Sequence, residues 1–137
     1  MIALSVDLGH ARTGLAVSDK SGFLASPLCV ITEYNDEKLI DKIAEKAEEV
    51  KAEILVVGLP KNMDGTEGES ARRAREIAAK LSERTGLPHH MQDERGTTIT
   101  AHNFLSDGNV YGKKRKQRVD AAAATIILQD YLDSRRG

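Results

Sequence analysis

Acidic residues stand at the ends of predicted secondary-structure elements in three places. Asp7 lies at the end of the first apolar strand, the pair Asp93-Glu94 lies at the end of another predicted strand, and Asp120 stands at the predicted start of the last helix. Each acid alone has an ordinary alternative, since Asp7 could be a solvated turn residue and Asp120 a favourable charge at a helix N-terminus. In open α/β sheets, however, ligands collect outside the carboxyl ends of the strands. Three acids at element ends therefore indicate one shared site.

Clustered carboxylates repel one another, so such a set predicts a divalent cation that neutralises them. Carboxylate oxygens are hard ligands and suit Mg²⁺ or Mn²⁺. Two such ions about 4 Å apart can stabilise the attacking and leaving oxygens of a phosphodiester displacement. Zinc is not expected, because the sequence has no cysteine and histidine spacing of the zinc-site type. This chemistry predicts a metal-dependent enzyme acting on phosphodiester bonds.

A dense basic run stands directly before Asp120. Five positive charges fall within the six residues from Lys113 to Arg118, and Gly112 precedes them. Most charge runs are simply solvated. Beside a candidate metal carboxylate, however, this run can hold the phosphate backbone of a nucleic acid. We therefore predict a mobile, phosphate-gripping loop over Gly112–Arg118, carried by Lys113, Lys114, Arg115 and Lys116.

A polar, glycine-bearing loop over Leu59–Gly68 follows a buried strand and precedes a helix. The free N–H groups at a helix start suit a phosphate. We therefore expect Asn62, Asp64 and Thr66 to form a substrate-facing loop. The alternative is a plain Asx-type turn, with Thr66 and Glu69 as a capping box of the following helix.

Length, charge and cysteine content limit the classes of protein to which the chain can belong. The chain has 137 residues, with 20 Lys and Arg against 21 Asp and Glu, which suits one domain over residues 1–137. Its single cysteine, Cys29, cannot form an internal disulfide, and the longest apolar runs are far too short to span a bilayer. No signal peptide is recognisable, so the cytoplasm is the expected location.

Hydrophobic periodicity predicts a mixed sheet with helices on its faces. Three closely spaced strands with short turns favour an antiparallel meander, and strands that alternate with helices follow it. The pattern predicts five strands. We expect strands at Ile2–Asp7, Leu15–Ser18, Phe23–Ile31, Ile54–Val57 and His89–Asp93, and helices around Leu39–Val50, Ala71–Leu81, Thr97–Ser106 and Val119–Leu132.

Four motifs, taken in order along nearly the whole chain, resemble one family. They resemble the YqgF-type family of ribonuclease H-like nucleases, whose members are described as Holliday junction resolvase homologues or pre-16S rRNA processing nucleases. The motifs are Asp7-x-Gly9-x-x-Arg12-x-Gly14-x-Ala16-x-Ser18, then Val57-Gly58-Leu59-Pro60-x-Asn62-Met63-Asp64-Gly65-Thr66, then Asp93-Glu94-Arg95 with Thr97-Thr98, and finally Lys114-Arg115-Lys116 leading to Asp120 and Ala122-Ala123.

The resemblance implies a ribonuclease H-like fold, with a five-stranded mixed sheet of order 3-2-1-4-5 flanked by helices. It implies Mg²⁺- or Mn²⁺-dependent cleavage by Asp7, Glu94 and Asp120, with Asp93 as the alternative to Glu94. Arg12, Asn62 and the basic run are then the expected nucleic-acid contacts. One residue departs from the family pattern, because Gly96 stands where a larger residue is expected.

Two other classes of protein compete with a nuclease. An actin-like kinase or ATPase shares the sheet topology and an early Asp-x-Gly turn, but it clamps nucleotide between two domains and this chain predicts one. A non-catalytic nucleic-acid-binding module could keep the same fold, although acids at all three positions argue against it. The residues leave open whether the substrate is precursor 16S ribosomal RNA or junction DNA, and whether the chain is a monomer or a homodimer.

Overall fold

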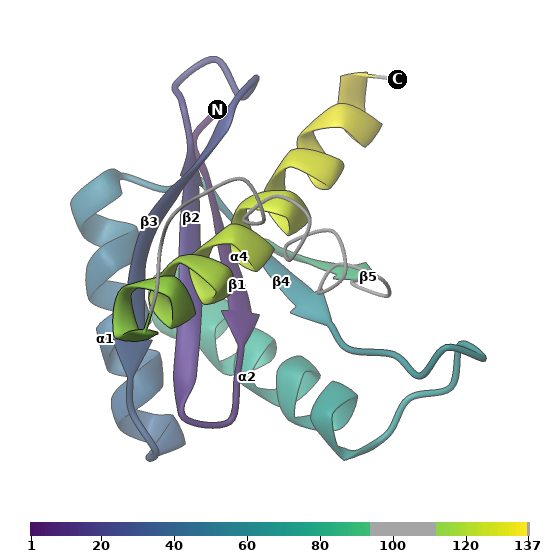
Figure 1. Ribbon diagram of the computed structural model, residues 1–137. Helices are drawn as coiled ribbons and strands as arrows, with labels where there is room; N and C mark the ends of the chain where they lie inside the picture. Colours follow the sequence, from purple (N-terminus) through teal and green to yellow (C-terminus); the bar gives the residue numbers. More distant parts are fainter. Residues whose placement is uncertain (94–111, 137) are drawn as a thin grey trace.

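The computed structural model describes the backbone of residues 1–93 and 112–136 and the side chains of residues 1–93 and 121–135. Five strands form one sheet of order β3-β2-β1-β4-β5, as predicted (Figure 1). In chain order the elements are β1 (Ala3–Leu8), β2 (Arg12–Ser18), β3 (Ala25–Thr32), α1 (Asp36–Val50), β4 (Ile54–Leu59), α2 (Glu69–Thr85), β5 (His89–Asp93) and α4 (Gly112–Arg136).

The sheet contains both antiparallel and parallel strands, because short turns join the first three strands whereas helices connect to the last two. The first three strands form the predicted antiparallel meander, and β4 and β5 add in parallel beyond β1. The β1–β2 turn is tight enough to require glycine, since a Cβ on Gly9 would overlap the carbonyl oxygen of Arg12. Strand β2 begins at Arg12, three residues before its predicted start at Leu15. The meander places β1, which carries Asp7, at the centre of the sheet.

Helices cover both faces of the sheet. Helices α1 and α2 pack on one face, where Leu4 and Val6 of β1 belong to the larger apolar core. Helix α4 crosses the other face (Figure 1), where Ala3 of β1 packs against Leu128 and its neighbours. Because successive residues of a strand point to opposite faces, Ser5 and Asp7 share the α4 face with Ala3.

Helix α4 begins earlier than the sequence predicts. The loop expected over Gly112–Arg118 is wrong, because the backbone of this segment forms the first turns of α4. Lysine, arginine and glutamine are strong helix formers, so the basic run extends the helix rather than interrupting it. The interpretation of Asp120 as a helix-start residue is also wrong, since Asp120 is the ninth residue of α4.

The start of α2 also differs from the sequence prediction. The predicted capping box is wrong, because the N-cap is Gly68 and no side chain caps the helix. Thr66 instead donates two hydrogen bonds to the carboxylate of Asp64, one from its backbone N–H and one from its hydroxyl. The predicted helix over Thr97–Ser106 lies outside the described residues. None of the helices described here is long and apolar enough to cross a membrane.

Candidate nuclease site

Asp7 lies at the carboxyl end of β1, beside glycines on both neighbouring strands. On β2 its partner is Gly14. Strand β4 runs parallel to β1, and Val57 of β4 lies beside Val6. The next residue of each strand follows the same register, so Gly58 lies beside Asp7. The three residues occupy one row on the α4 face, and the two glycines contribute no side chain to it. Both glycines are buried, whereas Asp7 is partly exposed, so Asp7 supplies the polar side chain of this row.

A buried hydrogen bond fixes α4 above β1. The hydroxyl of Ser5 donates to the carbonyl oxygen of Ala124 at 2.7 Å. At the other end of the helix, Arg135 contacts the sulfur of Met1 at 3.6 Å. Ala124 thus lies over the middle of β1 and Arg135 lies beside its beginning, so α4 runs against the direction of β1.

This direction brings the backbone of Asp120 toward the end of β1 that carries Asp7. Asp120 precedes Ala124 by one helical turn, which is about 6 Å along the axis. Asp7 follows Ser5 by two residues, which is about 7 Å along the strand. Both distances are measured from the contact between Ser5 and Ala124, one along α4 to Asp120 and one along β1 to Asp7, and they run in the same direction.

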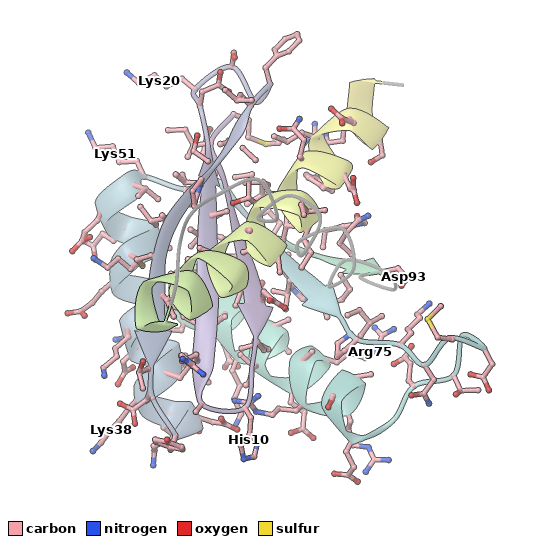
Figure 2. All side chains as sticks on the ribbon, viewed as in Figure 1. His10, Lys20, Lys38, Lys51, Arg75 and Asp93 are labelled. Carbon is pink, nitrogen blue, oxygen red and sulfur yellow. The ribbon has the colours of Figure 1, made fainter. Side chains whose placement is uncertain are left out.

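Asp93 does not share a face with Asp7. In β5 the ring of His90 packs on Tyr131 of α4, with centroids 4.8 Å apart, whereas Met91 packs against the core under α1 and α2. Alternation along the strand then puts Asp93 on the same side as Met91. Figure 2 shows Asp93 at the end of β5. The two acids share one edge of the sheet, but they lie on opposite faces.

Strand β4 separates β1 from β5, so the two acidic strand ends are not direct neighbours. Gln92 pairs with Gly58 and thus lies in the same row as Asp7, about 10 Å away across two strand spacings. Glu94 lies outside the described residues. Among the side chains of residues 1–93 and 121–135, no three His, Cys, Asp or Glu form a group that could hold a metal ion. The oxygen-donor chemistry of Asp7 nevertheless fits Mg²⁺ or Mn²⁺.

The turn after Asp7 is held by an arginine that the sequence analysis missed. Arg73 of α2 donates through Nη1 to the carbonyl oxygen of Gly9 at 2.9 Å, and its guanidinium also binds Asp36 at 2.9 Å. Its position among alanines on an amphipathic helix gives no local signal of this role. Arg12 lies close by, half-buried and opposite Thr32.

The β4–α2 loop, residues 60–68, is held together by its own polar groups. The Asn62 amide donates to the Thr66 hydroxyl at 2.9 Å, and that hydroxyl donates to Asp64 at 2.7 Å. The Asx-type turn named above as the alternative is therefore present at Asp64. The side chains of Asn62, Asp64 and Thr66 are exposed but bonded to one another.

A bidentate ion pair fastens the end of this loop to α2. Arg75 binds the two carboxylate oxygens of Glu67 at 2.7 and 2.8 Å, and Figure 2 shows Arg75 beside the loop. The hydrogen bond from Arg75 lowers the pKa of Glu67, so the pair stays charged at neutral pH. The basic residues Lys113–Lys116 lie in the first turns of α4.

The sheet order, and an acid at the end of the central strand beneath a crossing helix, define a ribonuclease H-like resolvase fold. Thermus thermophilus RuvC has this fold, with a TM-score of 0.61 at 14% identity, covering 100% of this chain and 97% of that one. The Fowlpox virus resolvase, solved with Holliday junction DNA, gives 0.64 at 11% identity and covers 100% of both chains.

The family follows from sequence. The model described as RuvX, Holliday junction resolvase, matches residues 1–134, so the chain belongs to this family. A protein of Nitrosospira multiformis named as a candidate pre-16S rRNA nuclease is 41% identical over 133 residues, covering 97% of this chain and 88% of its own length. The chain is accordingly a nuclease, a hydrolase of phosphodiester bonds, which decides against the kinase and the non-catalytic binding module.

Proposed function

We propose that this nuclease holds Mg²⁺ or Mn²⁺ through Asp7, Glu94 and Asp120 and uses it to cut structured nucleic acid. The observation that carries the proposal is the row that contains Asp7. This carboxylate lies at the carboxyl end of the central strand, between Gly14 and Gly58 and on the face that α4 crosses.

Bound divalent ions would activate the attacking water and neutralise the charge that develops on the phosphate. The residues of the chain supply the rest. Asp7 offers its carboxylate from a strand that hydrogen-bonds on both sides, so its backbone cannot shift easily. The Ser5–Ala124 bond holds α4, and with it Asp120, at a fixed place over β1.

Glu94 is preferred to Asp93 as the third ligand because of strand alternation. Asp93 belongs to the side of β5 that packs toward α1 and α2, whereas Asp7 belongs to the α4 side. A residue one position further along an extended chain would return to the α4 side. This argument supports Glu94 within the proposal and makes Asp93→Asn a useful control.

The proposed substrate is precursor 16S ribosomal RNA, with Holliday junction DNA as the second candidate. Support for the RNA comes from the name of a relative that is 41% identical over nearly the whole chain. Support for the junction comes from the description of the family. A junction needs two symmetric cuts and therefore a homodimer, whereas trimming of a single RNA strand suits a monomer. Light scattering in solution distinguishes these two states.

Arg12, Asn62 and the basic residues Lys113–Lys116 are the proposed contacts to the phosphate backbone. Consecutive residues of an α-helix lie about 100° apart around its axis. The four basic residues therefore cannot all lie on one side of α4, and we expect about two of them to contact one strand of the substrate.

The test is a cleavage panel of precursor 16S rRNA, a four-way DNA junction and plain duplex DNA, each with Mg²⁺, with Mn²⁺ or with EDTA. We expect metal-dependent cleavage that Asp7→Asn abolishes. Asp41→Asn is the matched control, because Asp41 lies on α1 on the opposite face, where its carboxylate pairs with Arg84. Cleavage that is unchanged in Asp7→Asn, or no cleavage of any of these substrates, would overturn the proposal.

A further inference from the structure

The turn between β1 and β2 continues the strand that carries Asp7. It consists of Gly9, His10 and Ala11, and Figure 2 shows His10 at this turn. Leu8 is the last residue of β1 that pairs with β2. Asp7 therefore lies only two residues from a backbone whose position the pairing of β1 with β2 does not fix.

Contacts from outside the sheet hold both ends of this turn. Arg73 of α2 donates through Nη1 to the carbonyl oxygen of Gly9 at 2.9 Å. The backbone N–H of Glu33, which follows β3, donates to the carbonyl oxygen of Ala11 at 3.0 Å. The Glu33 contact is made by the backbone, whereas the contact at Gly9, on the side of Asp7, depends on the side chain of Arg73.

The guanidinium of Arg73 is itself held by a second partner. Its Nη2 and Nε atoms donate to Oδ1 of Asp36 at 2.9 and 3.3 Å, and Asp36 is the first residue of α1. A guanidinium is planar and rigid, so it can hold a carbonyl oxygen and a carboxylate at the same time. Hydrogen bonds from a charged donor are also about twice as strong as those between neutral groups. One side chain therefore ties the turn to both α1 and α2.

Arg73 reaches the turn from the face of the sheet opposite to Asp7. Its neighbour Ala74 packs with Leu4 and Val6 in the core under α1 and α2, whereas Asp7 belongs to the α4 face. All three guanidinium nitrogens of Arg73 are engaged by Gly9 and Asp36. Arg73 can therefore act on the site through the backbone of the turn, without touching the substrate.

We propose that Arg73 is a positioning residue of this nuclease, which fixes the end of β1 through the Gly9 carbonyl oxygen and so aims the carboxylate of Asp7 at a divalent ion. The inference rests on the proposed function and adds to it a residue from the other face of the sheet. Groups that orient metal ligands typically contribute about 10- to 100-fold to metal affinity or activity. Arg73 acts two residues away from the ligand, so we expect the lower end of that range.

The sign of the effect separates positioning from charge. Removal of a positive charge near a cation site would by itself strengthen binding of the cation, because a repulsion is lost. Loss of a positioning contact weakens that binding instead. Weaker binding of the ion after removal of Arg73 therefore points to the contact with Gly9 and not to the charge.

The test compares Arg73→Gln with Arg84→Gln, the same substitution in the same helix. Arg84 also pairs with an acid of α1, Asp41 at 3.3 Å, but it lies eleven residues further along α2, about 16 Å along the helix axis. Glutamine is a good helix former, so α2 itself should persist in both variants. Binding of Mn²⁺ alone is measured from the EPR signal of the free ion. Cleavage is measured against metal concentration and, at saturating metal, against substrate concentration, and melting temperatures verify folding.

We expect Arg73→Gln to weaken binding of Mn²⁺ about tenfold and to raise the metal concentration for half-maximal cleavage by the same factor. The KM for nucleic acid should stay unchanged, and Arg84→Gln should match the parent in every measurement. If Arg73→Gln does not fold, Arg73→Lys carries the same test. Its ammonium group keeps the charge but lacks the planar fork that spans Gly9 and Asp36, so Mn²⁺ should again bind more weakly than in the parent.

Equal Mn²⁺ affinity in the parent and in a folded Arg73 variant would overturn the inference, even if the melting temperature falls, because Arg73 would then be purely structural. An equal loss in Arg84→Gln would overturn it as well. A raised KM with unchanged metal affinity would do the same, by making Arg73 a contact to nucleic acid. The proposed function fails separately, namely if Asp7→Asn binds Mn²⁺ as tightly as the parent.

Discussion

Asp120→Ala separates a metal ligand from a structural residue more sharply than any other single change. The structure removes the capping role, because Asp120 is the ninth residue of α4 rather than its first. Inside a helix, alanine is the most favourable residue, and aspartate is less favourable by up to about 0.7 kcal/mol. The variant should therefore be as stable as the parent without metal, or more stable by about 0.5 kcal/mol.

That gain corresponds to a rise of roughly 1–3 °C in melting temperature for a domain of this size. Relief of repulsion among the carboxylates acts in the same direction. With metal at about 100 times its Kd, the parent should gain about 2.7 kcal/mol by mass action. We expect the variant to lose most of this gain and to cut no substrate, as measured by melting with and without Mg²⁺ and by the cleavage panel.

Asp130→Ala is the matched control, since it makes the same substitution at an exposed position of the same helix. It should bring a similar gain from helix propensity and keep full cleavage and full stabilisation by metal. If Asp120→Ala cleaves like the parent and gains the same stability with metal, Asp120 is not a ligand and the three-carboxylate site is wrong. If both variants lose cleavage, the substitution acts through α4 itself.

Three further predictions concern the space, the charge and the loop around the site. Gly58→Ala should lower stability by about 1–3 kcal/mol, because Gly58 is buried and an added methyl group overpacks the row beside Asp7, and it should lower cleavage as well. Replacing all of Lys113–Lys116 by alanine should lower the slope of log affinity against log salt by about 1.4–1.8, the value for two phosphate contacts. Because Arg75 lowers the pKa of Glu67, their pair should persist at neutral pH and open only as the pH falls below about 4.3, the ordinary value for glutamate. Methyl NMR of Met63 should report that opening in the parent and no such step in Glu67→Gln.

Each of these outcomes has a clear opposite. Full cleavage by Gly58→Ala would show that the row beside Asp7 is not needed by the substrate. A drop of about 3 or more in the salt slope would mean that all four basic residues contact phosphate, against the helical geometry. If the methyl signal of Met63 still changes at acid pH in Glu67→Gln, a group other than Glu67 is responsible for the change.

The strands and the position of Asp7 could be predicted from the sequence because local patterns specify them. Short apolar runs between turn residues marked the first four strands, His89–Asp93 was assigned mainly from its context, and the meander followed from short connections. The start of α4 could not, because Gly112 and a charge run are typical of loops as well as of exposed helices. The segment is helical because lysine, arginine and glutamine are strong helix formers and because the same helix packs on the sheet further along, from Ala124 onward.

The side of the sheet on which Asp93 lies also escaped prediction. The segment His89–Asp93 has no apolar alternation, so the sequence does not tell which of its residues point to which face. The contacts of His90 with Tyr131 and of Met91 with the core supply that information. The hydrogen bond from Arg73 to the β1–β2 turn could not be predicted from the sequence either, because it depends on how α2 packs beneath that turn.

The bond between Ser5 and Ala124 has a consequence for when the site can exist. It joins residues 119 positions apart, so the two sides of the candidate site come from opposite ends of the chain. During synthesis β1 leaves the ribosome among the first residues, and α4 leaves it among the last. A nascent or truncated chain therefore carries Asp7 without the helix that holds Asp120. The site proposed above, which combines Asp7 with Asp120, can therefore form only after α4 has been synthesised.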